Sequence, residues 1–279
     1  MGQLSRPLNM QTKTNQDRQA DLHPVRIGCA GWSIPKHAAL QFPAGSNNLN
    51  RYSQLFDCCE INSSFYRPHR VATWQRWADS VPGDFRFAVK VPRTITHEAR
   101  LVCSPEILLD FLNQIRHLHD KLGPILVQLP PSLAFEREQV TAFFSLLRQH
   151  HAQDIVCEPR HTSWFTDRAN RTLQDFEISR VASDPACIPM ASTPGGASTI
   201  AYFRLHGSPR TYYSSYADEF LNRISVQVKT LARRARVWCV FDNTALGAAT
   251  TNAIELKAKV LLEDQYSRQS NKQHRRKAN

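Results

Sequence analysis

The sequence predicts one α/β domain, a single (β/α)8 barrel of the TIM type, on three observations. The chain has 279 residues, 42% of them hydrophobic, which suits one large core. Short apolar segments of strand type alternate with stretches of helical periodicity. Each of these strand segments turns from apolar to polar near its end, and barrel active sites form at the C-terminal ends of the strands.

Eight segments are expected to form the parallel strands. Their starts lie roughly 20 to 40 residues apart, a spacing typical of βα units. An open doubly wound sheet is the alternative fold, but the first segment ends in GCAGWS, a weak match to the dinucleotide fingerprint that lacks its third glycine. The strands are expected at 26–31, 58–64, 85–91, 124–130, 154–160, 178–184, 199–207 and 236–243.

Helical spacing of apolar residues is clearest over 105–121. Ser104 is placed to cap this helix, Pro105 suits its first turn, and Gly123 follows its end. The segment 185–198 contains too much Pro and Gly for an ordinary helix, so we expect the barrel to be irregular there, with a loop in place of the sixth helix. Other helices are expected at 71–80, 136–150, 163–176, 217–234 and 246–262.

The two ends of the chain differ in composition from the segment between them. Residues 1–24 are polar without periodicity and residues 263–279 are charged and basic, so both are expected to be flexible, disordered tails flanking one barrel domain at 25–262. No apolar run is long enough to span a membrane, and the N-terminal residues lack the apolar segment of a secretory signal. We therefore expect a cytoplasmic protein without a membrane partner.

Cysteine usage and net charge narrow the classes of partner. Seven cysteines, an odd number without a CxxC pair, predict buried reduced thiols rather than disulfides or a Cys-based zinc site. The formal net charge of +11 favours acidic partners, namely phosphates, carboxylates or nucleic acid. A generally basic surface without a dedicated partner fits the same charge.

Charged residues at the strand ends form the candidate catalytic set, which is Glu60, Lys90, Glu158 and His206. Side chains two residues apart share one face of a strand, so residues from separate strands can converge inside the ring. Glu60 and Glu158 suit the roles of general acid and base, and His206 suits proton transfer near neutral pH. Isolated buried charges are costly, so these groups are expected to pair with one another or with a ligand.

Further polar and aromatic residues at or just beyond the strand ends are candidate ligand-binding residues. Arg160 and Arg204, together with Lys90, suit the clamping of a phosphate or carboxylate group. The aromatic members suit stacking on a sugar or base, although packing is a common alternative role. For every member a structural ion pair or a packing role remains an alternative. The set is Trp32, Asn62, Tyr66, His97, Gln128, Arg160, Trp164, Asp184, Arg204, Tyr216 and Asn243.

The cofactor requirement stays open at this level. Glu158, Asp184 and His206 could hold Mg²⁺, Mn²⁺ or Zn²⁺, since carboxylates and imidazole are ligands of these ions. Three cationic side chains in the same set reduce the need for a divalent metal, so a metal site is not the favoured interpretation. The sequence gives no indication of the oligomeric state.

Seven motifs give the sequence a family resemblance. They are GW at 31–32, EINSSFY at 60–66, FRFAVKVPRTITH at 85–97, LGPILVQLPPS at 122–132, EPRHTSW at 158–164, YFRLHG at 202–207 and FDN at 241–243. In order and spacing, from about residue 25 to 262, they resemble the YecE-like family, known as domain of unknown function 72. The resemblance implies a barrel of the β/α kind with these motifs at the strand ends. It implies no reaction, because the family's name records none.

Three hypotheses about function follow. The leading hypothesis is an enzyme, a hydrolase, lyase or isomerase, that binds and transforms a small phosphorylated or carboxylated ligand at the C-terminal mouth of the barrel. A nucleic-acid-binding or repair-associated protein that uses the basic charge is the first alternative. A non-catalytic ligand sensor on the same scaffold is the second.

Overall fold

The computed structural model describes residues 22–261, which form one ten-stranded sheet with helices around it. The tails expected at 1–24 and 263–279 lie outside this described part, apart from residues 22–24. The strands are β1 (Val25–Ala30), β2 (Cys58–Ile61), β3 (Arg86–Lys90), β4 (Leu122–Gln128), β5 (Ile155–Glu158), β6 (Ile178–Arg180), β7 (Ala182–Asp184), β8 (Gly195–Gly196), β9 (Ile200–Leu205) and β10 (Arg236–Phe241).

Neighbouring strands follow the order β7-β9-β10-β1-β2-β3-β4-β5-β6-β8. Every pair in this sheet is parallel except β6 with β8, which is antiparallel. A parallel sheet whose first strand lies between the second and the last is the arrangement of a wound barrel. The predicted α/β barrel is therefore confirmed.

The sixth barrel strand is divided between its two neighbours. Only Val181 separates β6 from β7, yet β6 pairs with β5 whereas β7 pairs with β9. The Val181 N–H donates to the carbonyl of Cys157 at 2.8 Å. The continuous segment 178–184 therefore joins both sides of the sheet and nearly closes the ring, while β8 covers the free edge of β6.

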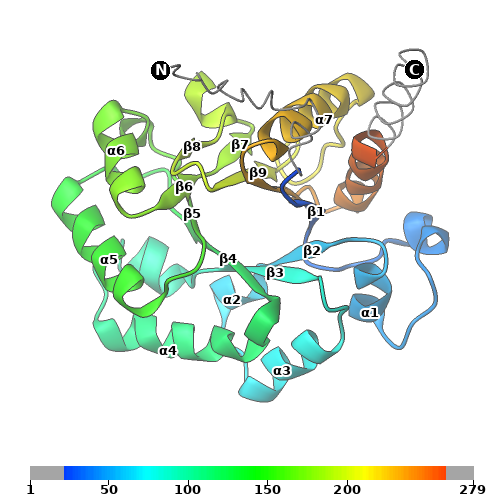
Figure 1. The fold of residues 1–279 in the computed structure, drawn as a ribbon, viewed down its shortest axis with the longest axis horizontal. Coiled ribbons are helices and arrows are strands. Elements are labelled where there is room, and N and C mark those ends of the chain that lie inside the picture. The colour runs from blue at the N-terminus through cyan, green and yellow to red at the C-terminus, as the bar shows by residue number, and fades with distance from the viewer. Residues whose placement is uncertain (1–21, 262–279) are drawn as a thin grey trace, which may run out of the picture.

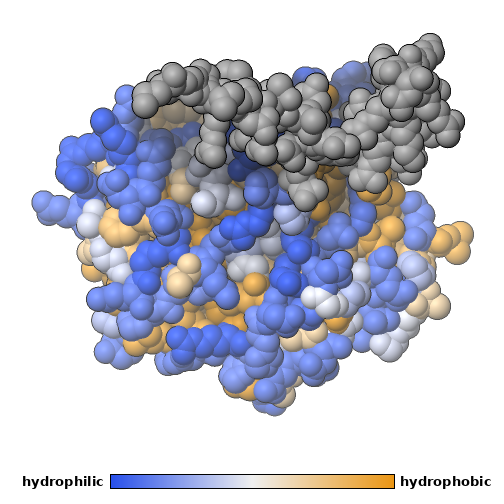
Figure 2. All heavy atoms as spheres, viewed as in Figure 1, coloured by the Kyte–Doolittle hydropathy of each residue, from blue (hydrophilic) through white to orange (hydrophobic). Residues whose placement is uncertain are grey.

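Helices lie around the outside of the strands (Figure 1). The longer ones are α3 (Val71–Asp79), α4 (Pro105–Ile115), α5 (Arg137–His150), α6 (Asp167–Asp175), α7 (Asp218–Ala232) and a helix over 248–261. Two short helices, α1 (Asn48–Ser53) and α2 (Ser63–Tyr66), precede and follow β2. Hydrophilic residues cover most of the face seen in Figure 2, with smaller hydrophobic areas between them. None of the helices within residues 22–261 combines the length and the apolar character that a bilayer crossing needs.

Two helical segments show where sequence periodicity and structure agree and differ. The helix expected over 105–121 ends at Ile115 and continues as a 3-10 segment, Arg116–Lys121, in which His119 has φ of 50°. The Ser104 side chain makes no capping hydrogen bond. In the segment 185–198 there is no α-helix, as predicted, but only a 3-10 turn at Pro189–Ser192 and the short strand β8.

The core consists of two layers separated by the sheet. Along β3, Ala88 faces the inside of the ring, whereas Phe87 and Val89 face the helices. Inside the ring, the Tyr202 ring stacks on Trp238 with a centroid separation of 5.9 Å. The interior of the ring is therefore filled with apolar side chains, and the polar residues at the C-terminal strand ends pack directly above this inner core.

Candidate functional site

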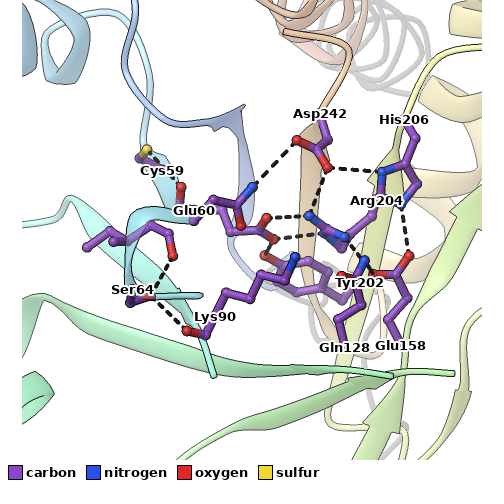
Figure 3. A network of polar contacts seen from close by, with 12 residues as sticks. Cys59, Glu60, Ser64, Lys90, Gln128, Glu158, Tyr202, Arg204, His206 and Asp242 are labelled. Carbon is purple, nitrogen blue, oxygen red and sulfur yellow. Dashed lines mark hydrogen bonds and ion pairs between the residues drawn. The ribbon is translucent and has the colours of Figure 1, made fainter. Parts of the chain in front are cut away.

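The C-terminal ends of β2, β5, β9 and β10 bring charged residues together inside the ring. Glu60, Glu158 and Arg204 each lie two residues beyond an inward-facing member of the inner core, and so share its face of the strand. His206 and Asp242 follow directly after β9 and β10 and join the same cluster. All five side chains are buried. Figure 3 shows them converging on one volume.

Arg204 is the centre of this cluster, and its side chain is fully buried at 0% exposure. Its Nε and Nη2 donate to the two oxygens of Glu60 at 3.0 and 2.6 Å. Nη1 donates to Glu158 Oε2 at 2.6 Å, and Nη2 also donates to Asp242 Oδ2 at 3.0 Å. One guanidinium therefore joins four strands through charge-assisted hydrogen bonds.

Glu158 is held ionised by the cations around it. Burial alone would raise the pKa of this carboxyl, but Arg204, Arg160 and His206 outweigh that effect and place its pKa well below the usual range. Each oxygen accepts two hydrogen bonds, because Gln128 Nε2 donates to Oε2 at 2.9 Å and Arg160 Nη2 donates to Oε1 at 3.3 Å.

His206 lies between two carboxylates. Its Nε2 is 2.8 Å from Glu158 Oε1 and its Nδ1 is 3.0 Å from Asp242 Oδ2. Because carboxylates only accept hydrogen bonds, these two contacts favour an imidazolium ring that donates from both nitrogens, although the Arg160 guanidinium also lies 3.3 Å from Nε2. Burial lowers the pKa of His206, but attraction to Glu158 and the two hydrogen bonds raise it above its ordinary value.

Lys90 lies at the end of β3 and is 7% exposed. Its Nζ is 3.9 Å from the centre of the Phe65 ring. Within residues 22–261 its ammonium makes no hydrogen bond or ion pair. Burial and the nearby Arg204 charge lower the pKa of Lys90 to about 8, although Glu60, Glu158 and Asp242 act in the opposite direction.

Two polar groups at the cluster's edge are incompletely bonded. Asn62 Nδ2 donates weakly to Asp242 Oδ1 at 3.5 Å, and Asn62 Oδ1 is buried without a partner in the described chain. Arg160 keeps 28% of its side chain exposed. A cavity of about 290 Å³ next to the cluster is lined by Glu158, Arg160 and His206 on one side and by the loop after β7 on the other.

Several predicted ligand-binding residues lie outside this cluster, in packing roles. Trp32 packs edge-on against Trp77 and Phe87, with centroid separations of 5.1 and 6.3 Å. Trp164 is fully buried, and its Nε1 donates to the Leu133 carbonyl at 2.9 Å.

Two further predicted residues are neighbours of Phe65, on whose ring the Lys90 ammonium lies. The His97 ring meets the Phe65 ring at a centroid distance of 4.9 Å. Tyr66 is exposed, packs edge-on against Phe65 and lines a separate cavity of about 210 Å³ between α2 and α4.

The last three predicted residues tie together loops around the mouth. The Tyr216 hydroxyl donates to Asp184 Oδ1 at 2.9 Å and accepts from the Gly207 N–H at 2.8 Å. Asn243 Nδ2 donates to the Ser214 carbonyl at 2.9 Å. Asp184 is thus directed at Tyr216 and not at Glu158 and His206. In the part of the chain that the structure describes, no group of three or more His, Cys, Asp or Glu residues is placed to hold a metal ion.

Two residues of the cluster were absent from the predicted set. Asp242 contacts both Arg204 and His206, and the Tyr202 hydroxyl donates to Glu60 Oε2 at 2.9 Å. Alternation along β10 signals Asp242, because it lies two residues after the inward-facing Val240. Tyr202 lies within an apolar strand segment, and nothing in that segment distinguishes it from a core aromatic residue.

Comparison with known proteins places the chain among relatives. A family model described as protein of unknown function DUF72 matches residues 26–277. UPF0759 protein YecE of Escherichia coli (strain K12) is 29% identical over 166 residues, which cover 57% of this chain and 59% of YecE. UPF0759 protein YunF of Bacillus subtilis (strain 168) is 30% identical over 154 residues, 51% of this chain and 52% of YunF. The chain thus spans less than two thirds of the length of these curated relatives.

Solved structures show the same fold. A DUF72 family protein from Thermotoga maritima MSB8 superposes with a TM-score of 0.70 at 26% sequence identity, covering 86% of this chain and all of that one. A DUF72 family protein from Enterococcus faecalis V583 gives a TM-score of 0.73 at 20% identity, covering 85% of this chain and 95% of the other. Since the family model also matches most of the sequence, the protein belongs to the DUF72 family.

Proposed function

We propose that the barrel mouth binds a small molecule bearing a carboxylate or phosphate, and that the protein is an enzyme acting on that molecule. The observation that carries the proposal is the charge of the buried cluster. Three carboxylates (Glu60, Glu158 and Asp242) face four cations (Lys90, Arg160, Arg204 and the imidazolium of His206). One positive charge is left for an anionic ligand to neutralise.

The position of the uncompensated charge supports a small ligand. The charge of Arg204 is neutralised by its three carboxylate partners. Within residues 22–261 Lys90 has no bound anion, and Arg160 lines the cavity of about 290 Å³. A cavity of this size suits a small molecule better than a nucleic-acid backbone.

The protonation states support an acid role for His206. Glu158 is ionised at neutral pH and its oxygens accept from four donors, so it suits the positioning of Arg204 and His206, while the His206 imidazolium suits a proton donor. Glu60 is bound on both oxygens by Arg204, which suits the positioning of that guanidinium. These roles fit a hydrolase, lyase or isomerase.

Calorimetric titration with lactate and glycerol 3-phosphate at pH 7 tests the binding part of this proposal. We expect Lys90→Met and Arg160→Met each to weaken binding by about tenfold, roughly 1.4 kcal/mol. The matched control is Lys121→Met, which removes a buried lysine directly before β4, at the end of the strands opposite the mouth. Binding should weaken as the pH rises through about 8, where Lys90 loses its charge. Absence of binding to the unmodified protein, or equal binding by all variants, would contradict the proposal.

A further inference from the structure

We propose that Lys90 acts as a covalent nucleophile, forming an imine with the carbonyl carbon of a substrate that also bears a carboxylate or phosphate. This inference rests on the proposed function and names its substrate class, an oxo acid or an oxo phosphate. Lys90 is then a catalytic residue in the strict sense, because its Nζ bonds to the reacting carbon.

The first observation is that Lys90 lacks the hydrogen-bond acceptors that the other buried cations within residues 22–261 have. Lys121 is similarly buried at 9% exposure, but its Nζ donates to the Gly83 carbonyl at 2.8 Å and to Asp120 at 3.3 Å. Arg204 has three carboxylates, and Arg180 donates to Asn170. Within residues 22–261, Lys90 is the buried cation without a hydrogen-bond acceptor.

The second observation explains why nearby carboxylates leave Lys90 unpaired. Both oxygens of Glu60 accept from Arg204, and Tyr202 donates to one of them. Glu158 accepts from Arg204 and three further donors. Figure 3 shows the Lys90 side chain extending from β3 toward Arg204 and its carboxylate partners. The amine is therefore held next to a cationic centre without being fixed in an ion pair.

The surroundings of Lys90 favour the neutral amine that nucleophilic attack requires. A lysine becomes nucleophilic when it is desolvated beside apolar groups or beside another cation, because both disfavour the ammonium form. Lys90 is buried and has Arg204 as a cationic neighbour, and these two effects lower its pKa although its ammonium also lies against the Phe65 ring. Its lowered pKa of about 8 leaves on the order of one tenth of the amine neutral at pH 7.

The chemical step balances without an added oxidant or reductant. The nitrogen lone pair attacks the carbonyl carbon, and the carbonyl π electrons move to oxygen, which takes one proton from the nitrogen. The resulting carbinolamine then accepts a proton from solvent, loses water and leaves an iminium ion on Lys90. Arg160 lines the neighbouring cavity of about 290 Å³, and we assign to it the binding of the substrate's acid group. An iminium withdraws electrons from the neighbouring carbon, which suits a lyase or an isomerase.

Reductive trapping tests this inference on the full-length protein. Pyruvate and dihydroxyacetone phosphate are supplied as the oxo acid and oxo phosphate, with sodium borohydride to reduce any imine. Mass spectrometry of tryptic peptides then locates the adduct, which also blocks cleavage after Lys90. We expect modification of Lys90 at least tenfold above the average surface lysine, and about tenfold less when acetone, which has no acid group, replaces pyruvate.

Two variants distinguish imine formation by Lys90 from a role that needs only its positive charge. Lys90→Arg keeps the positive charge but cannot form an imine, so it should retain lactate binding within about threefold and give no adduct at position 90. Lys121→Arg should leave the Lys90 adduct unchanged.

The outcomes distinguish the two proposals. If lactate binding depends on Lys90 but borohydride traps no excess adduct there, the imine is overturned and the anion site stands. If neither the oxo compounds nor their hydroxy counterparts bind, both proposals fail together.

Discussion

At the scale of single residues, the buried cluster pairs one guanidinium with three carboxylates. Arg204 is fully buried, and the cost of removing its charge from water is offset because three carboxylates accept its hydrogen bonds at 2.6 to 3.0 Å. Lys90 lies at the end of β3 and, within residues 22–261, has no carboxylate bound to its ammonium. The same cluster thus contains one cation with three carboxylate partners and one whose ammonium has no such partner in the described part of the chain.

Replacement of Lys90 should stabilise the protein. Lys90→Met removes an ammonium whose pKa is lowered to about 8, so we expect the free energy of unfolding at pH 7 to rise by on the order of 1–3 kcal/mol. Lys121→Met, in contrast, should lower it by about 1 kcal/mol, because the Gly83 carbonyl loses its donor. Urea unfolding of the two variants measures both values. A loss of stability in Lys90→Met would show that Lys90 has a partner in solution.

The pH dependence of stability should report His206. Its pKa is raised above 6.5 in the folded protein, so its stabilising contribution is complete below about pH 6.5 and is lost as the pH rises through the raised value. We expect the unmodified protein to lose more stability between pH 6.5 and pH 9 than His206→Asn does. His150→Asn on the surface is the control and should follow the unmodified protein. Parallel pH profiles for the unmodified protein and His206→Asn would contradict the imidazolium assignment.

At the scale of elements, β1 and β2 are joined through a side chain of α1. The Tyr52 hydroxyl accepts from the Cys29 N–H at 2.7 Å and donates to the Cys58 carbonyl at 3.1 Å. Gly28 makes room for this contact, since a Cβ there would lie 2.1 Å from the Cys58 oxygen and 2.9 Å from the Tyr52 hydroxyl. The position of Glu60, two residues along β2 from Cys58, depends on this junction.

Gly28→Ala should therefore disturb the β1–β2 pairing. We expect its free energy of unfolding to fall by about 1–3 kcal/mol, because a backbone oxygen must shift to admit the methyl group. Gly83→Ala is the matched control, since nothing lies within 4 Å of a Cβ at that position, and it should change stability by less than about 0.5 kcal/mol. Thermal or urea unfolding measures the stability of both variants. Equal losses of stability in Gly28→Ala and Gly83→Ala would contradict the close approach at Gly28.

Element boundaries were predicted less well than element types. Apolar spacing continues through Leu118, which is buried, so the pattern does not show that α4 ends at Ile115. The chain continues past α4 as a 3-10 segment, and the positive φ of His119 lies inside that segment, shortly before β4. The absence of a helix over 185–198, in contrast, followed from Pro and Gly content, because these residues act on the backbone locally.

At the scale of the whole molecule, carboxylate–arginine pairs cross the barrel at both ends. At the C-terminal end, the buried pair Glu60–Arg204 links β2 to β9. At the N-terminal end, Arg236 and Asp154 form a bidentate pair at 2.7 and 2.8 Å between the starts of β10 and β5, with side-chain exposures of 46% and 23%. Both pairs join the two oxygens of a carboxylate to one guanidinium, but only the first is fully buried and belongs to a larger cluster.

Matched carboxylate-to-amide substitutions should therefore differ greatly. Glu60→Gln leaves the buried Arg204 charge partly uncompensated, so we expect a loss of about 3–5 kcal/mol of unfolding free energy. Asp154→Asn breaks a solvent-screened pair and should lose about 0–1 kcal/mol. Urea unfolding at pH 7 gives both values. Similar losses would mean that Arg204 is reached by water in solution.

The sequence by itself determined the barrel and the faces of its strands. Alternation with a period of two is a local property, so it places Glu60, Glu158 and Arg204 on the inward face before any partner is known. Tertiary structure decided which groups meet. The register of the sixth strand directs Ser183, and not Asp184, to the mouth, since Val181 is its inward-facing neighbour. The pairing of Arg204 with Asp242, and the isolation of Lys90, depend on distances across a nearly closed ring, which only the packing of all its strands fixes.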